Sequence, residues 1–105
     1  MKLNLKALEK QWYTLKGEDG TEVSFCIRPF PLSKIKTIKQ ADIKGLWMEF
    51  DYCLTDWKGI EVVDEEFKVN KKNKQIMFDF KVDVREFVFK KAQTALDSTS
   101  EQLKN

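Results

Sequence analysis

The side chains that most often carry out enzyme chemistry are few in this 105-residue chain. It contains no histidine, so no imidazole can act as a base near neutral pH or activate a nucleophile. Its two cysteines, Cys26 and Cys53, are widely separated in the sequence and do not match the ligand spacing of a zinc site. We expect both to be small buried thiols. The chain is therefore predicted to be neither an enzyme nor a metal protein.

Glycine-rich loops that hold phosphate groups are also missing from the sequence. The four glycines are Gly17, Gly20, Gly45 and Gly59, and they form neither a GxGxxG nor a GxxxxGK pattern. No nucleotide cofactor, and no other cofactor or small-molecule substrate, is therefore expected.

Carboxylates gather most densely at residues 64–66, where the sequence reads Asp-Glu-Glu. This cluster lacks the alternating acids and the glycine of a calcium loop, and we expect it to form a solvated bend. Glu49, Asp51 and Asp56 could line a groove if their segment is helical. No nucleophile or amide donor accompanies them, so they do not complete a catalytic mechanism.

The charge is almost balanced, with 19 basic and 17 acidic residues and a formal net charge of +2. This balance does not favour nucleic-acid or membrane binding. No apolar stretch approaches the roughly 18 residues of a membrane span, and the first residues do not resemble a signal peptide. We expect a cytoplasmic protein.

The elements that position these residues begin with a β-hairpin over about 11–28. Asp19-Gly20 is a favoured turn pair, and Val23, Phe25 and Ile27 alternate on one face of the returning strand. A single α+β domain over 1–105 is predicted, with helices packed on this hairpin.

The clearest predicted helix is a long amphipathic one over about 83–97, capped by Asp83. Its buried stripe is predicted to comprise Val84, Phe87, Val88, Lys91, Ala92, Ala95 and Leu96. Phe89 falls off this stripe and is expected to be exposed, as a hint of a contact surface. The polar tail from about residue 98 is expected to fray.

Two shorter helices are also expected. One starts after Pro31 with Ser33 as its N-cap, and the other is capped by Asn70 or Asn73. The second helix is predicted to carry Ile76, Met77 and Phe80.

Residues 43–57 fit two periodicities, one helical and one of a half-buried strand. The length of the segment favours a helix that ends near Gly59. Three tryptophans, Trp12, Trp47 and Trp57, lie in or near these elements. At least two are expected in the core, and the third is expected at an interface, without indication of which one.

Two motifs in this order carry a family resemblance. Residues 25–30 read FCIRPF and residues 54–60 read LTDWKGI, followed by an acidic bend, a short capped segment and a C-terminal amphipathic helix. The chain thereby resembles, over nearly its whole length, small phage and prophage proteins described as tail assembly chaperones or minor tail-assembly proteins. Relatives often carry a glycine and a proline in the bend, where this chain has DEEF at 64–67.

The resemblance implies a role in tail morphogenesis inside the host cell. Such a chaperone binds the tape-measure or tail-tube protein through aromatic anchors with a charged rim. On this basis Trp47, Phe50, Trp57 and Phe89 are the candidate protein-contact residues. Two alternatives remain open: a structural tail or head–tail joining subunit that forms a homo-oligomeric ring, and a small phage protein that binds a host protein.

Overall fold

The structure, a computed structural model, describes residues 2–35, 42–63 and 65–97. The expected frayed tail and Asp64 of the acidic bend lie outside these residues. The secondary-structure elements are η1 (Leu5–Leu8), β1 (Gln11–Lys16), β2 (Glu22–Ile27), α1 (Leu32–Ile35), α2 (Ile43–Cys53), β3 (Leu54–Lys58), β4 (Glu61–Val62), β5 (Glu65–Glu66), α3 (Lys71–Phe80) and α4 (Val82–Asp97).

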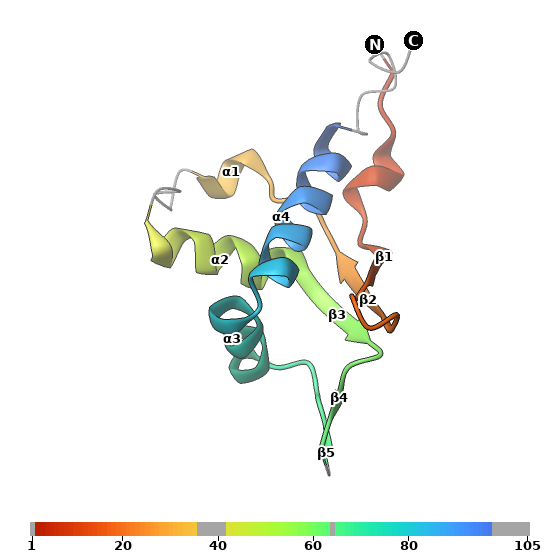
Figure 1. Cartoon of the computed structure of the whole chain (residues 1–105). Coiled ribbons are helices and arrows are strands. Elements are labelled where there is room, and N and C mark those ends of the chain that lie inside the picture. The colour runs from red at the N-terminus through yellow and green to blue at the C-terminus, as the bar shows by residue number, and fades with distance from the viewer. Residues whose placement is uncertain (1, 36–41, 64, 98–105) are drawn as a thin grey trace.

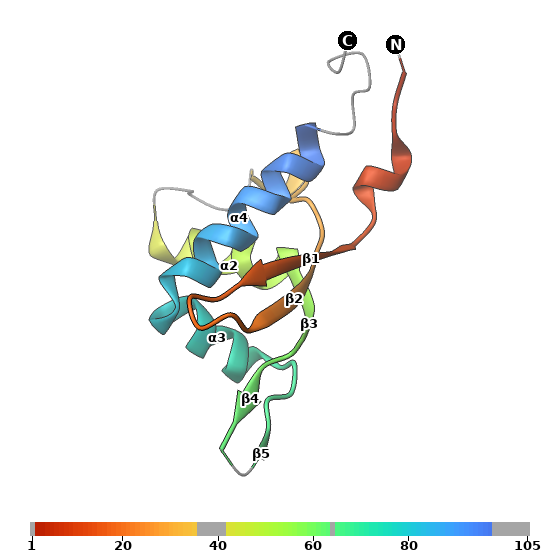
Figure 2. The ribbon, with the colours of Figure 1, turned by 45° about the vertical axis from the view of Figure 1, so that its right-hand side comes forward.

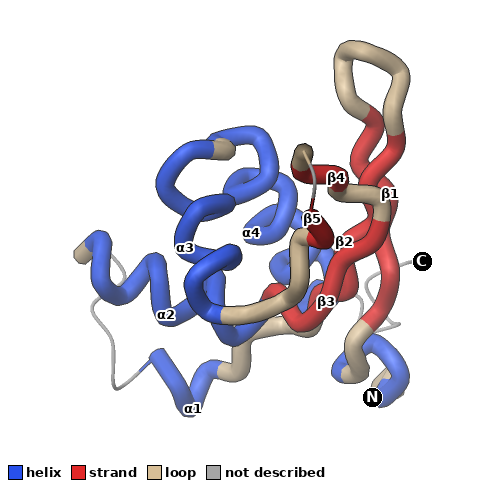
Figure 3. The backbone as a smooth tube through the Cα atoms, turned by 90° about the horizontal axis from the view of Figure 1, so that it is seen from below, coloured by secondary structure: helices blue, strands red, loops and turns tan. Residues whose placement is uncertain are grey.

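The architecture is α+β, as predicted. Strands β1, β2 and β3 form an antiparallel sheet in the order β1-β2-β3. Helix α4 lies across one face of this sheet, and α2 and α3 lie beside it in the same layer (Figures 1 and 2). Seen from below, the α-helices lie largely on one side of the molecule, and the strands lie on the other together with the short helix η1 (Figure 3).

The N-terminal hairpin is confirmed. Tyr13 pairs with Phe25 across the ladder between β1 and β2. Gly20 at the turn has φ +87°, a conformation that favours glycine. The N–H of Gly17 donates to the carbonyl of Thr21 at 2.8 Å and closes the turn. The Asp19 carboxylate also accepts from the N–H of Thr21 at 3.0 Å, which fixes the loop locally.

The segment 43–57 is not one helix, so the length argument was wrong. Helix α2 ends at Cys53 and the chain continues directly into strand β3. Asp42 caps the helix by accepting from the N–H of Lys44 at 3.2 Å. Gly59 does not end a helix; it follows β3 with φ +90°, and a Cβ there would lie 2.8 Å from a backbone oxygen of β2. The helical pattern therefore holds only as far as Cys53, and Met48, Phe50 and Tyr52 of the strand-like alternation lie inside α2 rather than in a strand.

The N-terminal caps of the later helices agree only in part with those predicted from the sequence. Asn70 caps α3 as predicted, since its side chain accepts from the N–H of Asn73 at 2.8 Å. Asp83 is not a cap, because α4 begins one residue earlier, and Asp83 instead lies in the first turn. There its carboxylate is favourable beside the helix N-terminus. Ser33 likewise lies inside α1 rather than before it.

The core fills the space between the inner face of the sheet and helices α2, α3 and α4. Its fully buried large side chains are Phe25, Ile27, Phe50, Cys53, Leu54 and Val88. The predicted α4 stripe is confirmed as buried or half-buried along its length. Helix α3 carries Ile76, Met77 and Phe80, as predicted. Met77 is buried together with Phe78, whereas Ile76 and Phe80 are exposed.

A second, two-stranded ribbon follows β3. Its register pairs Glu61 with Glu66 and Val62 with Glu65. We call residues 61–66 the acidic arm. The expected bend at 64–66 is therefore partly wrong, because Glu65 and Glu66 form a strand. The arm projects beyond the sheet and the helices in Figures 1 and 2.

Candidate functional site

The four predicted contact residues do not form an exposed surface. Phe50 is 0% exposed and Trp57 is 6% exposed, so both belong to the core. Trp47 and Phe89 are half-buried and pack against it. The expectation of exposed anchors was therefore wrong for Phe50 and Trp57, and Phe89 is less exposed than its position off the α4 stripe indicated.

Three of these four side chains form one aromatic cluster inside the helical layer. The ring centres of Phe50 and Phe89 are 6.1 Å apart, and those of Phe50 and Trp47 are 6.3 Å apart. Phe78 of α3 joins them, 5.4 Å from Phe50 and 5.6 Å from Trp47. The cluster joins α2, α3 and α4, and its role is to hold the helices together.

Trp57 lies apart from this cluster and anchors the base of the acidic arm. Its indole ring stacks on Phe67 with 5.4 Å between ring centres. Its Nε1–H donates to the carbonyl oxygen of Phe67 at 2.8 Å. The tryptophan of the LTDWKGI motif therefore has a structural role that its local contacts explain.

The exposed tryptophan is Trp12, which the sequence left undecided. It is 42% exposed. Because side chains alternate along a strand, it faces away from Tyr13, which packs against the core. The ammonium of Lys58 lies 4.2 Å from the centre of its ring, a cation–π contact between β1 and β3.

One recess that could receive a ligand is a groove of about 600 Å³ between the end of β2, helix α2 and the start of α3. We call it the basic groove. Its charged lining residues are Arg28, Lys34, Lys71, Lys74 and Asp51, and its apolar lining residues are Phe30, Trp47, Met48, Tyr52 and Val69. The described lining thus carries four cations and one carboxylate.

Tyr52 is the centre of one wall of the basic groove. The guanidinium of Arg28 lies 3.7 Å from the centre of its ring, and the ammonium of Lys34 lies 4.9 Å from it. The Nε–H of Arg28 donates to the backbone oxygen of Tyr52 at 2.7 Å, near the C-terminal end of α2 where a cation is favourable. Phe30 meets the same ring edge-on, with 5.5 Å between the ring centres. Arg28 is thereby held in a fixed orientation.

A second part of the lining is built around Asp51. The ammonium of Lys74 donates to its carboxylate at 3.2 Å and to its backbone oxygen at 3.0 Å. Lys71 lies 3.6 Å from the other carboxylate oxygen, and its side chain is 84% exposed. One carboxylate cannot neutralise both ammonium groups and Arg28, so the groove keeps a positive potential.

Apolar surface accompanies this charge. Met48 is 45% exposed and Val69 is 38% exposed. Trp47 adds a half-buried ring, and it is the one predicted contact residue that lines this groove. The combination favours a ligand that carries carboxylates next to apolar side chains.

A smaller recess of about 310 Å³ lies between α2 and α4 and includes Phe89 and Glu49 in its lining. Burial raises the pKa of the Glu49 carboxyl. Cys53 lies nearby at the end of α2; burial, followed by the charge of Glu49, raises its pKa to about 12. Both cysteines are buried and unpaired, as predicted. A thiol with a raised pKa is a poor nucleophile at neutral pH.

The sequence indicated some of the residues that line the basic groove, but it did not predict the cluster of cations in the groove. Of the carboxylates considered for a groove, Asp51 lines the basic groove, Glu49 lines the smaller recess and Asp56 lies in β3. Arg28 was visible as part of the FCIRPF motif, and Lys71 and Lys74 have the spacing of one helix face. Nothing in the sequence placed those three cations side by side.

No protein-family model, curated protein or solved structure matches this chain. In the described residues, no group of three or more His, Cys, Asp or Glu side chains could hold a metal ion. No helix among them is long and apolar enough to cross a bilayer.

Proposed function

We propose that this protein is a non-enzymatic phage or prophage tail-assembly protein, a chaperone that binds the tape-measure or tail-tube protein in the host cytoplasm. The proposal combines the resemblance of residues 25–30 and 54–60 to that family with the character of the basic groove. The groove is the observation that carries it, because its cations border an apolar floor.

The binding mode follows from the geometry of the groove. A partner segment places apolar side chains against Met48 and Trp47, and burial of their surface drives association. Its carboxylates pair with Lys71 and with the guanidinium of Arg28, which has five N–H donors, one of which, Nε–H, donates to Tyr52. The partner is therefore an acidic and partly apolar segment of a tail protein.

The test uses two neighbouring lysines of α3. Lys71 lines the groove, whereas Lys72 is exposed on the same helix and does not line it. The full chain is co-expressed with a tape-measure or tail-tube protein of the same phage or prophage, and the affinity of the recovered complex is measured by calorimetry. K71E is expected to weaken binding about tenfold, and K72E to change it less than about twofold.

Salt provides a second readout of the same contact. Binding is expected to weaken as the NaCl concentration rises, because exposed ion pairs are screened. Equal effects of K71E and K72E would contradict a role for the groove. Recovery of the chain without any tail protein would contradict the proposed function.

A further inference from the structure

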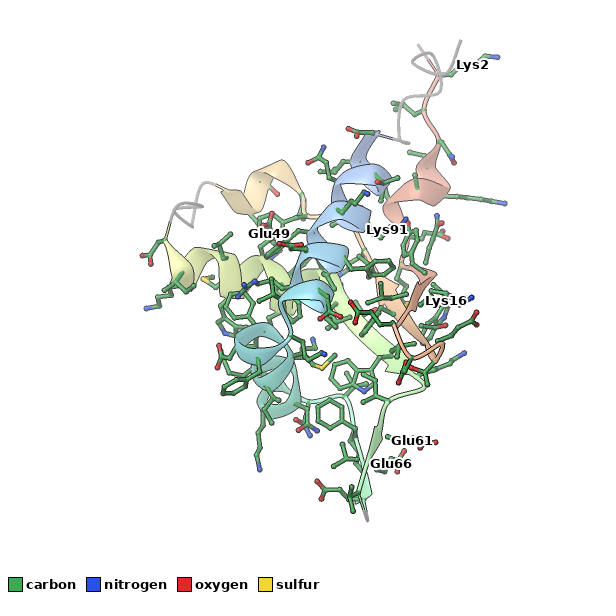
Figure 4. The ribbon with its side chains drawn as sticks, viewed as in Figure 1. Lys2, Lys16, Glu49, Glu61, Glu66 and Lys91 are labelled. Carbon is green, nitrogen blue, oxygen red and sulfur yellow. The ribbon has the colours of Figure 1, made fainter. Side chains whose placement is uncertain are left out.

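The acidic arm has the properties of a docking element. All three of its described glutamates, Glu61, Glu65 and Glu66, are exposed. Val63 at its tip is 87% exposed, the most exposed of the large hydrophobic side chains among the described residues. Glu61 and Glu66 lie on the arm, away from the helical layer (Figure 4).

The ladder of the arm brings two like charges together, and Glu65 and Glu66 also line a recess that includes Lys68 and Lys72. Glu61 and Glu66 are directly opposite in the ladder, and like charges in this arrangement repel. Each strand has only two residues, and an isolated two-stranded hairpin is marginally stable in water. A cationic surface against the arm would remove this repulsion and stabilise the ribbon.

The basic groove offers such a surface, and the arm does not occupy it within its own chain. None of the described residues 61–66 lines the groove. Its described lining has more cations than carboxylates, whereas the charged residues described in the arm are all glutamates, so the two surfaces carry opposite charge. Its exposed apolar floor, which includes Met48 and Val69, matches the exposed Val63 at the tip.

We propose that the acidic arm of one copy docks in the basic groove of a second copy of this chain. Glu61, Glu65 and Glu66 pair with the cations of the groove, and Val63 covers the side chain of Met48. This inference rests on the proposed function only in using the same groove, and it requires no tail protein. Self-docking occupies the groove until the tail protein arrives and displaces the arm.

The experiment measures the mass of the full chain by sedimentation from about 10 µM to about 1 mM. The monomer is 12.4 kDa. In about 50 mM NaCl the average mass is expected to rise with concentration, and in about 500 mM NaCl the rise is expected to disappear. Circular dichroism checks that each variant is folded.

Two charge-reversed variants locate the contact. The arm variant is E61K/E65K/E66K and the groove variant is K34E/K71E; each alone is expected to stay monomeric. A mixture of the two is expected to associate again, since every arm then faces a groove of opposite sign.

A third variant has the same net charge as the arm variant but an intact arm. In E9K/E18K/E86K the reversed glutamates are exposed and lie outside both the arm and the groove. It is expected to self-associate like the natural sequence.

Three results would overturn the inference: a monomer at all concentrations, self-association that persists in the arm variant, or equal loss in the charge-matched variant. The arm variant keeps its groove. It therefore still captures a tail protein if the proposed function holds, and the two proposals can fail separately.

Discussion

Replacing Phe50 by alanine tests whether this ring belongs to the core or to a partner surface. The side chain is 0% exposed. Its centre lies between 5.4 and 6.3 Å from those of Phe78, Phe89 and Trp47. Removing the ring leaves a cavity among α2, α3 and α4, and such truncations destabilise proteins by about 3–5 kcal/mol.

This loss is large against the roughly 5–15 kcal/mol by which a domain of this size is stable. In urea, with a slope of about 2 kcal/mol per molar, F50A is expected to lower the unfolding midpoint by about 2 M. The transition is followed by circular dichroism at low temperature. Should F50A not fold, F50L keeps most of the volume and is expected to lose less than about 1.5 kcal/mol.

Phe80 supplies the matched control, because it undergoes the same Phe→Ala change at a position that is 77% exposed. F80A is expected to shift the stability by less than about 0.5 kcal/mol. The core assignment would be refuted if F50A unfolded at nearly the natural midpoint, or if F80A were the more damaging change. A contact role for Phe50 predicts the reverse pattern, with intact stability and a weaker complex.

Four further changes probe local features. G59A is expected to cost about 2 kcal/mol or more, because φ is +90° and the new Cβ would meet the carbonyl oxygen of Glu22 at 2.8 Å. G20A, with φ +87° and open space around it, is expected to cost only about 1 kcal/mol in the same urea titration. N70A removes the side-chain cap of α3 and is expected to lower the free energy of unfolding by about 1 kcal/mol, measured in urea. Burial raises the pKa of Glu49, so its ionisation disfavours the folded state, and stability that is full at acid pH is lost as the pH rises through that raised pKa. E49Q is therefore expected to raise the melting temperature at neutral pH and to leave it unchanged near pH 3; a gain of equal size at both pH values would contradict this reasoning.

The parts of the fold that could be predicted are those whose signal is local. The hairpin follows from the turn pair Asp19-Gly20 and from the alternation of apolar residues around Phe25. Both signals lie within a segment of fewer than twenty residues. The stripe of α4 follows from its own periodicity, and the cap at Asn70 needs only the next three residues. None of these features depends on what the rest of the chain does.

The switch from α2 to β3 at Leu54 could not be predicted in this way. The apolar residues of 43–57 satisfy both periods, so the local free energies of helix and strand are close. Pairing with β2 decides between them, because Phe25 and Trp57 are cross-strand neighbours in the sheet. That interaction joins residues more than thirty positions apart, and no local pattern reports it.

The burial of Phe89 has a similar origin. A helix that packs against one surface buries one stripe, and Phe89 lies outside the stripe that faces the sheet. Because α2 lies beside α4, Phe89 reaches Phe50 at 6.1 Å, and the buried arc of α4 becomes wider than a single stripe. The burial of Phe89 is therefore determined by the helix that packs beside α4, and not by the periodicity of α4 itself.

The distribution of charge on the surface likewise depends on the fold and not on the composition alone. A net charge of +2 predicts no strong preference for any charged partner. The fold nevertheless gathers the cations of the groove from three separate segments, at Arg28, at Lys34 and at Lys71 with Lys74. It places Glu61, Glu65 and Glu66 on a projecting arm. Local potential acts over about 10 Å at moderate salt, so a partner experiences the groove or the arm and not the average. Binding by this chain is therefore expected to depend strongly on salt, although its composition is nearly neutral.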